Sequence, residues 1–246
     1  MIDNGKLKFA VVTTSWDDGD PLDMKLAELL DKYEVPATFY LPIQNTQRTS
    51  LDTSSIQQLA GRFDIGGHTF HHLDLTKLSS GQVADEVNSG KTELEAIIGQ
   101  KISAFCYPMG KSNSRIAKIV GKSGFTGART LQACRRKILN PLQMGTLIHA
   151  RNYISPHYVK HALQSSDAPL FRMMLQKNLF SQNWDSIARE MLYFILHQGG
   201  IWHLCGHSWE GEANNDWTAL ESLFREIKII SDGVTKWDNS AILHRL

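Results

Sequence analysis

Two neighbouring carboxylates near the start of the chain are the first residues whose types suggest chemistry. Asp17 and Asp18 stand in the stretch TTSWDDGD, after the apolar and β-branched run Phe9–Thr14, and Gly19 follows them. Adjacent like charges repel, so two of them at the expected end of a strand imply two separate tasks. Neighbouring side chains at a strand end also point in different directions. One carboxylate is suited to hold a metal ion and the other to act as a general base.

A histidine-containing run, GGHTFHHLDL, supplies groups that complement Asp18. His68 and His72 are four residues apart, and on one helical turn this spacing puts both imidazoles on the same face. Two histidines and one carboxylate can hold a divalent ion and leave positions open for water and substrate, as a hydrolytic metal centre requires. An isolated pair of this kind more often caps a helix or lies in solvent. The WDDG run at another strand end favours the ligand interpretation, with His71 one residue off the shared face.

A second histidine-containing run, HLCGHSWE, comes late in the chain at the expected end of another strand. His207 is suited by its near-neutral pKa to act as a general acid. His203 shares the strand face of His207, because four residues span two full periods of a strand. It either lines the same pocket or is a buried histidine satisfied by hydrogen bonds. The rings of Trp209, Trp16 and Tyr107 adjoin these groups and could stack on a substrate or pack in the core.

Strand-like apolar runs alternate with helical patterns along almost the whole chain, and Ser79 with Gln82 forms a capping-box pattern. The expected strands are Phe9–Thr14, Val35–Ile43, Phe63–Thr69, Ile102–Gly110, Phe125–Thr130, Gly145–Ile154 and Gly200–Glu210. The expected helices are Pro21–Tyr33, Ser54–Arg62, Leu78–Gly99, Ser114–Gly124, most of Leu170–Gly200, and Asp216–Gly233. Strands separated by helices predict βαβ units and a parallel sheet. We therefore expect one α/β barrel-like domain over residues 1–246, with its chemistry where strands end.

The composition excludes several classes of partner. The formal charge of the 246-residue chain is only +1, which argues against nucleic acid or an anionic membrane surface as the main partner. No segment approaches the roughly 20 apolar residues that span a bilayer. Cys106, Cys134 and Cys205 form no CxxC pair and read as reduced thiols. The N-terminus lacks the apolar core of a signal peptide, so we expect a cytoplasmic protein. The sequence makes no prediction of its oligomeric state.

The runs TTSWDDGD, GGHTFHHLDL, AFCYPMGK and LCGHSWE occur in the order and at the strand ends expected for a known family. Over about Phe9 to Glu210 the chain resembles the polysaccharide deacetylase family (carbohydrate esterase family 4). The D-D-G turn and the H-T-x-x-H run match the family pattern position by position, and the later runs match it less specifically. The resemblance implies a distorted (β/α) barrel of seven strands that carries a divalent metal ion and hydrolyses an N-acetyl or similar amide.

Carried over residue by residue, the resemblance assigns roles within the two specific motifs. Asp17 matches the catalytic base. Asp18, His68 and His72 match the metal ligands. Zinc is the first expectation for the ion, with cobalt, nickel or iron as alternatives.

The later motifs imply further roles. In YPMG, Met109 matches the residue whose backbone N–H helps to stabilise the oxyanion, and His207 looks like the late-strand general acid. The other residues expected on the substrate side, some of them shaping the YPMG loop, are Tyr107, Pro108, Gly110, Arg129, Trp209 and His203.

Two departures from the family pattern indicate a divergent branch. The family often has an arginine near the catalytic base at the start of the third motif, where this chain has Cys106. Arg129, in the run GART at another strand end, is the candidate replacement beside Asp17, although an arginine there is equally compatible with an ordinary ion pair. The D-x-x-D-W motif that orients the acid histidine has no clear counterpart. These departures bear on the substrate more than on the metal chemistry.

The expected function is that of a metal-dependent deacetylase, a hydrolase of carbon–nitrogen bonds other than peptide bonds. It would remove an N-acetyl group from a sugar, an oligosaccharide, a sugar conjugate or a related small amide. The nearest alternative is a metal amidase that acts on a formyl group or a cyclic amide. A different class of alternative is a non-catalytic carbohydrate-binding barrel, which the presence of a base, three ligands and an acid candidate disfavours.

Overall fold

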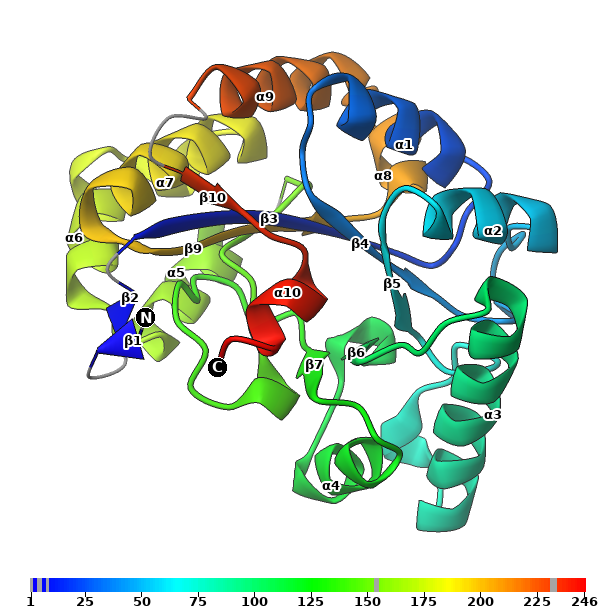
Figure 1. The fold of residues 1–246 in the computed structure, drawn as a ribbon. Coiled ribbons are helices and arrows are strands. Elements are labelled where there is room, and N and C mark those ends of the chain that lie inside the picture. The colour runs from blue at the N-terminus through cyan, green and yellow to red at the C-terminus, as the bar shows by residue number, and fades with distance from the viewer. Residues whose placement is uncertain (1, 4–5, 8, 153–154, 231–233) are drawn as a thin grey trace.

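The alternation of strands and helices produces one curled parallel sheet (Figure 1). The computed structural model describes residues 2–3, 6–7, 9–152, 155–230 and 234–246. Seven strands lie side by side in the order β7-β6-β5-β4-β3-β9-β8, and every neighbouring pair is parallel. Their bounds are β3 Ala10–Asp17, β4 Ala37–Leu41, β5 Asp64–Gly67, β6 Ala104–Cys106, β7 Gly127–Arg129, β8 Ile148–His149 and β9 Gly200–Gly206. The predicted distorted seven-stranded (β/α) barrel is confirmed, as a sheet whose edges are β7 and β8.

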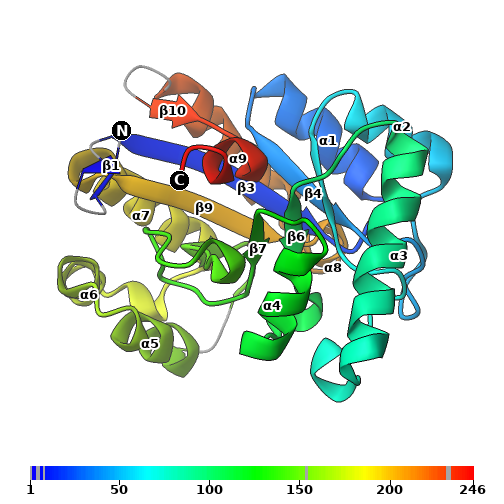
Figure 2. The ribbon, with the colours of Figure 1, turned by 60° about the horizontal axis from the view of Figure 1, so that its bottom comes forward.

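Helices line the outer side of this curled sheet, as Figures 1 and 2 show from two directions. Their bounds are α1 Asp23–Lys32, α2 Thr53–Ala60, α3 Ser80–Ile98, α4 Ser114–Lys122, α5 Ser155–Gln164, α6 Ala168–Gln176, α7 Trp184–Gln198, α8 Ser208–Ala213 and α9 Trp217–Ile229. The predicted capping box is present, because Ser79 and Gln82 exchange side-chain-to-backbone bonds at the start of α3. None of the described helices is long and apolar enough to cross a bilayer.

Several elements differ from the sequence-based expectation. The long helix expected over Leu170–Gly200 is two helices, α6 and α7, separated by a short 3-10 turn at Leu179–Ser181. The expected strand Gly145–Ile154 shrinks to the two residues of β8, and the expected strand over Gly200–Glu210 ends at Gly206, where α8 takes over. Helix α5 was not predicted. Ile154 and Gly233, two expected element ends, lie outside the described residues.

Strand β3 shows how the sheet aims side chains at two layers. All eight of its residues are buried, as expected for a parallel strand covered on both faces. Trp16 points outward and meets the ring of Phe224 on α9 edge-on, with centroids 6.3 Å apart. Ser15 points inward and bonds to His203 on β9. Because side chains alternate along a strand, Asp17 also faces the interior, at the carboxyl end of the strands.

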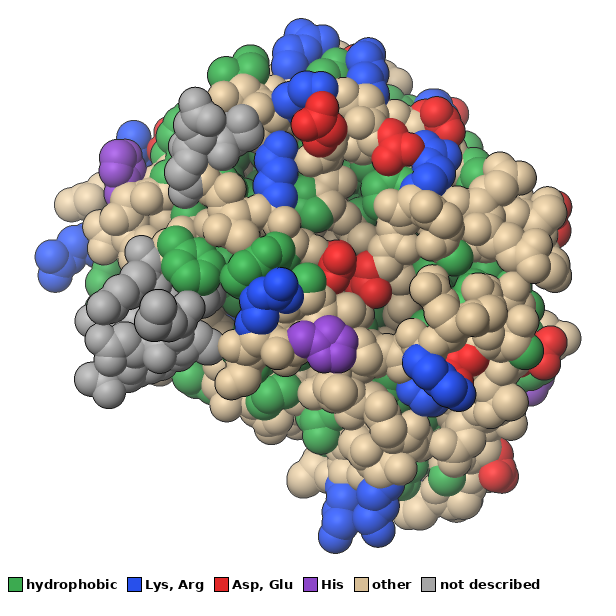
Figure 3. All heavy atoms as spheres, in the orientation of Figure 1, with side chains coloured by type: hydrophobic (Ala, Val, Ile, Leu, Met, Phe, Trp, Pro, Cys, Tyr) green, Lys and Arg blue, Asp and Glu red, His purple; other side chains and the backbone are tan. Residues whose placement is uncertain are grey.

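The C-terminal segment returns to the interior of the curl. Strand β10 (Val234–Lys236) pairs in parallel with the first residues of β3, and helix α10 (Asn239–Leu243) follows inside the curved sheet (Figure 1). The side chain of Asn239 is fully buried, accepts a bond from Thr13 and donates one to Tyr40. Helix α10 therefore fills the interior with polar as well as apolar contacts. Over this face, Figure 3 shows acidic, basic and histidine side chains close together.

Candidate active site

Three side chains with metal-binding atoms meet at the carboxyl ends of β3 and β5. One Oδ of Asp18 lies 3.2 Å from His72 Nε2 and 3.7 Å from His68 Nε2, and the three ligand atoms lie within 4.8 Å of one another. All three side chains are buried. Asp18 has a φ of 83°, and Gly19 follows at 63°. These two left-handed residues turn the chain at the end of β3 and aim Asp18 at the histidines.

The two histidines meet for a different reason from the one predicted. The segment from His68 to His72 is not helical, so the shared helical face inferred from the four-residue spacing is wrong. A loop with left-handed residues at Thr69 (φ 69°) and His72 (φ 56°) brings the rings to a centroid distance of 4.8 Å. Thr69 Oγ1 accepts a 3.0 Å bond from the backbone N–H of His72 and closes the turn. A tight loop, not a helix, places both imidazoles beside Asp18.

The chemistry of this donor set suits a divalent ion. His68 donates from Nδ1 to the carbonyl oxygen of Cys106 at 2.8 Å, which fixes its tautomer and leaves Nε2 facing Asp18. Burial, assisted by the neighbouring His68, lowers the pKa of His72 to about 4, so its ring is neutral at pH 7. Burial raises the pKa of Asp18, but the nearby histidines outweigh this and hold it well below its usual value. Two imidazoles and one carboxylate are ligands for zinc and similar ions.

Asp17 lies next to this triad, on the interior side of the sheet. Its Oδ2 accepts a hydrogen bond from Arg129, whose side chain is fully buried at the end of β7. Burial alone would raise the pKa of Asp17, but the charge of Arg129 outweighs it and lowers the pKa. Cys106 Sγ lies 3.8 Å from the same oxygen. The structure thus places Arg129, at the end of β7, beside Asp17. Cys106, the position at which the resemblance led us to expect an arginine, lies on β6.

His207 faces both aspartates from the start of α8. Its Nε2 lies 3.9 Å from Asp17 Oδ2 and 3.8 Å from Asp18 Oδ2. Burial lowers its pKa, but a 2.8 Å bond from Nδ1 to Glu210 and the charges of the two aspartates outweigh burial and raise it. Glu210 in turn accepts a 2.8 Å bond from Arg151.

Glu210 is a functional residue that the sequence motifs alone did not identify, and without it His207 had no predicted orienting group. The three-residue spacing between His207 and Glu210 was the sequence feature that could have identified this contact. A carboxylate three residues after a histidine that begins a helix can reach the Nδ1 of that histidine.

The three aromatic residues considered for sugar stacking have different surroundings. Trp16 and Tyr107 are fully buried, and the Tyr107 hydroxyl donates to the carbonyl oxygen of Leu142 at 2.8 Å. Both rings pack in the core and cannot stack on a substrate. Trp209 is only half-buried, lies with its ring 5.1 Å from that of His207, and donates from Nε1 to Asp18 Oδ2 at 3.0 Å. Trp209 is therefore the aromatic residue at this site.

The YPMG loop begins directly after Cys106. Pro108–Gly110 forms a short 3-10 turn in which Met109 has a φ of 57° and a side chain that is 39% exposed. Gly110 has a φ of 66°, and a Cβ there would lie 2.6–2.8 Å from Leu131. This glycine is needed both for its backbone angle and for the close approach of Leu131.

Two of the remaining histidines do not join the triad. His203 is buried under the site, bonds to Ser15 Oγ at 2.8 Å, and has its pKa lowered to about 3 chiefly by burial. It fits the second of the two predicted roles, a buried histidine satisfied by a hydrogen bond. The ring of His71 is 42% exposed and bonds to Glu86 at 2.6 Å, so it supports the loop and does not face the triad.

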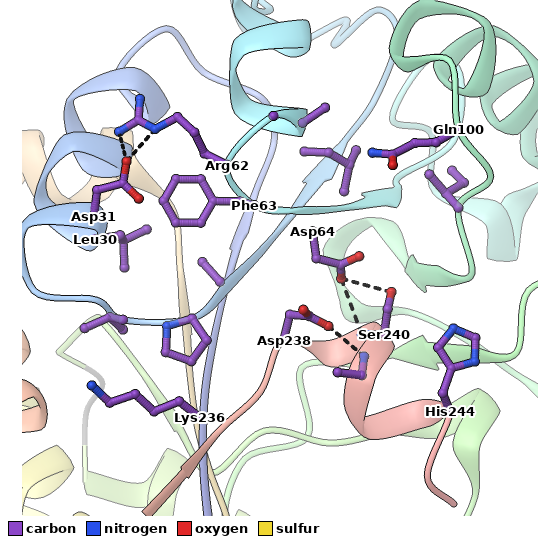
Figure 4. A pocket seen from close by; sticks show the side chains of 18 of the residues that line it. Leu30, Asp31, Arg62, Phe63, Asp64, Gln100, Lys236, Asp238, Ser240 and His244 are labelled. Carbon is purple, nitrogen blue, oxygen red and sulfur yellow. Dashed lines mark hydrogen bonds and ion pairs between the residues drawn. The ribbon is translucent and has the colours of Figure 1, made fainter. Parts of the chain in front are cut away.

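A cavity of about 760 Å³ lies away from these residues, at the amino ends of the strands (Figure 4). It is lined by the first residues of β4 and β5 and by the C-terminal segment, with Asp64, Lys236, Asp238 and His244 among its side chains. Asp64 Oδ2 accepts bonds from Thr38 and from Ser240 on α10. The triad of Asp18, His68 and His72 and this cavity therefore lie at opposite ends of the strands.

Curated proteins match less than half of the chain. Protein YlxY of Bacillus subtilis, described as uncharacterized, is 26% identical over 112 residues, which are 46% of this chain and 34% of that protein. The peptidoglycan-N-acetylmuramic acid deacetylase PdaA of the same organism is 28% identical over 111 residues, 42% of this chain and 40% of PdaA. This chain thus aligns with well under half the length of either relative.

Solved structures match nearly the whole chain. A putative polysaccharide deacetylase from Mycobacterium smegmatis has a TM-score of 0.69 at 18% identity, over 98% of this chain and 91% of that one. BA3943, a CE4 family pseudoenzyme from Bacillus anthracis, has a TM-score of 0.59 at 16% identity, over 98% of this chain and 66% of that one. At these identities the likeness is one of fold.

A family model described as polysaccharide deacetylase matches residues 4–128, a span that begins before Asp17 and includes the whole metal-binding triad and Cys106. That span covers half of the chain and ends just before Arg129, the residue that donates a hydrogen bond to Asp17. On this match the chain belongs to the polysaccharide deacetylase family.

Proposed function

We propose that this protein is a metal-dependent deacetylase that releases acetate from an N-acetylated sugar, oligosaccharide or sugar conjugate. Family membership supports a carbohydrate deacetylase. One observation carries the finer proposal. An ionised carboxylate, Asp17, and a histidine, His207, both lie beside a three-ligand cluster, with His207 Nε2 within 4 Å of both aspartates. Base, metal site and acid are the three parts that amide hydrolysis by water requires.

The metal ion would be held by Asp18, His68 and His72, with zinc as the first candidate and cobalt, nickel or iron as alternatives. When bound, such an ion lowers the pKa of a water to ~7 and polarises the amide carbonyl. Asp17 takes the proton from the attacking water. The hydrogen bond from Arg129 keeps Asp17 ionised in its buried position, so that it is ready to accept a proton at neutral pH.

The remaining steps use Met109 and His207. The backbone N–H of Met109 donates to the oxyanion of the tetrahedral intermediate, a contact whose loss typically costs ~2.7–4 kcal/mol of barrier. The leaving amine is too basic to depart as an anion, and His207 supplies its proton. Glu210 holds the His207 ring through Nδ1 and favours its protonated form, which a general acid needs.

The test is acetate release by zinc-loaded protein from acetylated chitooligosaccharides, measured beside N-formyl and cyclic ureido compounds. Release of acetate supports the proposal. Turnover of only the formyl or cyclic compounds would instead establish the amidase alternative. Sugar binding without any product would establish a non-catalytic barrel, a state that the name pseudoenzyme gives to BA3943.

A further inference from the structure

An exposed arginine, Arg48, stands at the rim of the proposed active site. Its guanidinium carbon lies 3.3 Å from the ring centroid of Trp209, close enough for face-to-face stacking. Trp209 in turn donates from Nε1 to Asp18, a proposed metal ligand, at 3.0 Å. One aromatic ring therefore connects Arg48 to the metal-binding cluster.

The loop that carries Arg48 is bonded to both of the loops that carry the proposed ligands. Leu51 donates its backbone N–H to the carbonyl oxygen of Gly19, next to Asp18, at 2.7 Å. Gln44 donates to the carbonyl oxygen of Phe70 at 2.7 Å, and Thr46 Oγ1 donates to that of His71 at 3.3 Å. Phe70 and His71 lie between the two ligand histidines.

Within the loop, Asn45 is buried and fixes the turn. Its backbone N–H donates to Ser50 Oγ at 2.9 Å, and its Oδ1 accepts from the N–H of Gln47 at 3.0 Å. The position of Arg48 over the site is thus set by the same backbone that positions the ligands.

The guanidinium of Arg48 stacks on Trp209 and is not neutralised by any described carboxylate. Among the residues that the structure describes, no carboxylate lies within ion-pair distance of its guanidinium. The carboxylates of the site already have partners, because Asp17 accepts from Arg129 and Glu210 accepts from Arg151. Stacking occupies one face of the guanidinium and leaves its N–H donors free along the edges. A planar fork of donors is the geometry that binds a carboxylate or phosphate.

We infer that Arg48, held by Trp209, makes the site selective for an N-acylated sugar that carries an anionic group, a carboxylate or a phosphate, near the scissile amide. This inference rests on the proposed deacetylase function and adds the class of substrate. Arg48 binds the anion and orients the substrate. It takes no part in proton transfer.

The test compares three substrates on zinc-loaded protein: a neutral N-acetylglucosamine oligosaccharide, the matched sugar with a carboxylate-bearing ether on the ring, and the matched sugar with a phosphate monoester. Arg48→Gln should lower kcat/KM for an anionic substrate about tenfold, mainly through KM, because a hydrogen bond to a charged group contributes about that much. The neutral substrate should change by less than about twofold. The matched control is Arg172→Gln, on the exposed side of α6. It should leave kcat/KM unchanged for the neutral and the anionic substrates.

Of the two anionic substrates, the one whose kcat/KM falls further in Arg48→Gln identifies the anion, carboxylate or phosphate, that Arg48 binds. An equal loss on neutral and anionic sugars, or no loss on either anionic sugar, would overturn the inference. Calorimetric binding of the same three sugars to wild type and Arg48→Gln gives a readout that needs no turnover. Wild type could bind the anionic sugars more tightly than Arg48→Gln does and yet release no acetate. In that case the deacetylase proposal fails while the selectivity inference stands.

Discussion

At the scale of single residues, the site combines what the sequence showed with what only the fold could show. The types and order of Asp17, Asp18, His68 and His72 could be recognised in the sequence, because metal and proton chemistry need those side chains. Arg129 could also be named as a candidate partner of Asp17, but the partner of His207 was not identified. Glu210 reaches His207 because β9 ends at Gly206 and a helix starts two residues later. That boundary depends on tertiary packing, which no local pattern reports.

Arg129 provides a prediction about a buried ion pair. Removing one partner of such a pair costs about 3–5 kcal/mol, because the other charge is left buried and unpaired. Arg129→Met should therefore lower the free energy of unfolding by about that amount, as measured by urea denaturation. Arg129→Met combined with Asp17→Asn should recover part of the loss. Equal stabilities of the single and double variants would contradict the pairing.

Glu210 provides a prediction about the acid histidine. Glu210→Gln removes the carboxylate that holds His207 Nδ1, and we expect kcat to fall about 10²-fold with little change in bound metal, because the ring loses its orientation and its proton affinity. Glu212→Gln is the control. Glu212 lies on the same helix but pairs with Lys25 on the surface, so that variant should keep its kcat. Comparable losses in the two variants would contradict this role of Glu210.

At the scale of elements, the sequence predicted most helices and strands, and the differences come from long-range contacts. The three- and four-residue spacing of apolar residues predicted α1, α3, α4 and α9. This signal lies within each helix and does not depend on contacts with distant residues. It gave no sign of β10 and α10. These two elements are short, and they are held by pairing with β3 and by bonds from Asn239 to β3 and β4. The helical turn expected at His68–His72 was wrong because Gly67 ends a strand and the following loop takes left-handed angles.

Gly90 supplies a prediction at this scale. It interrupts the helical pattern of α3, and the structure shows why. A Cβ at Gly90 would lie 2.6–2.8 Å from the backbone of Thr69 and Phe70, in the loop between the two ligand histidines. Replacing a helical glycine by alanine normally stabilises a protein by up to about 1 kcal/mol. Gly90→Ala should instead destabilise it and weaken metal binding, since the backbone of the loop must move.

Gly81 in the same helix is the control for Gly90. A Cβ there meets nothing within 4 Å, so Gly81→Ala should leave metal binding unchanged and should not destabilise the protein. Thermal unfolding and metal titration of the two variants make the comparison. A stabilised Gly90→Ala variant with normal metal affinity would contradict the close approach of helix and loop.

At the scale of the whole molecule, the two ends of the strands carry different sets of polar side chains. The carboxyl ends of the strands carry the candidate active site. At the amino ends α10 packs into the curl and Asp64 bonds to Ser240, as Figure 4 shows. Burial and the charge of Asp238 raise the pKa of Asp64 to about 6, although its hydrogen bonds act in the opposite direction. That a single domain spans residues 1–246 stays a prediction.

The raised pKa of Asp64 predicts a pH-dependent contribution to stability. The folded state binds the proton of Asp64 more tightly than the unfolded state does, so the contribution is complete below about pH 4 and is lost as the pH rises through about 6. A rise of about two pKa units corresponds to at most about 3 kcal/mol.

Asp64→Asn mimics the protonated form and should lack this dependence. Relative to wild type, the free energy of unfolding of the variant should therefore increase between pH 4 and pH 8. Asp85→Asn, on the exposed side of α3, controls for the loss of one charge. A difference between Asp64→Asn and wild type that stays constant with pH would contradict the shifted pKa.

The most direct test of the central claim is the metal content of two neighbouring variants, measured by elemental analysis after loading with zinc and gel filtration. The two adjacent aspartates are proposed to have different tasks. Asp18→Ala should lose the bound ion and all deacetylase activity. Asp17→Asn should keep one zinc per chain and lose turnover. A wild-type protein that holds no stoichiometric ion with zinc, cobalt, nickel or iron, or an Asp18→Ala variant that binds metal as wild type does, would contradict the account.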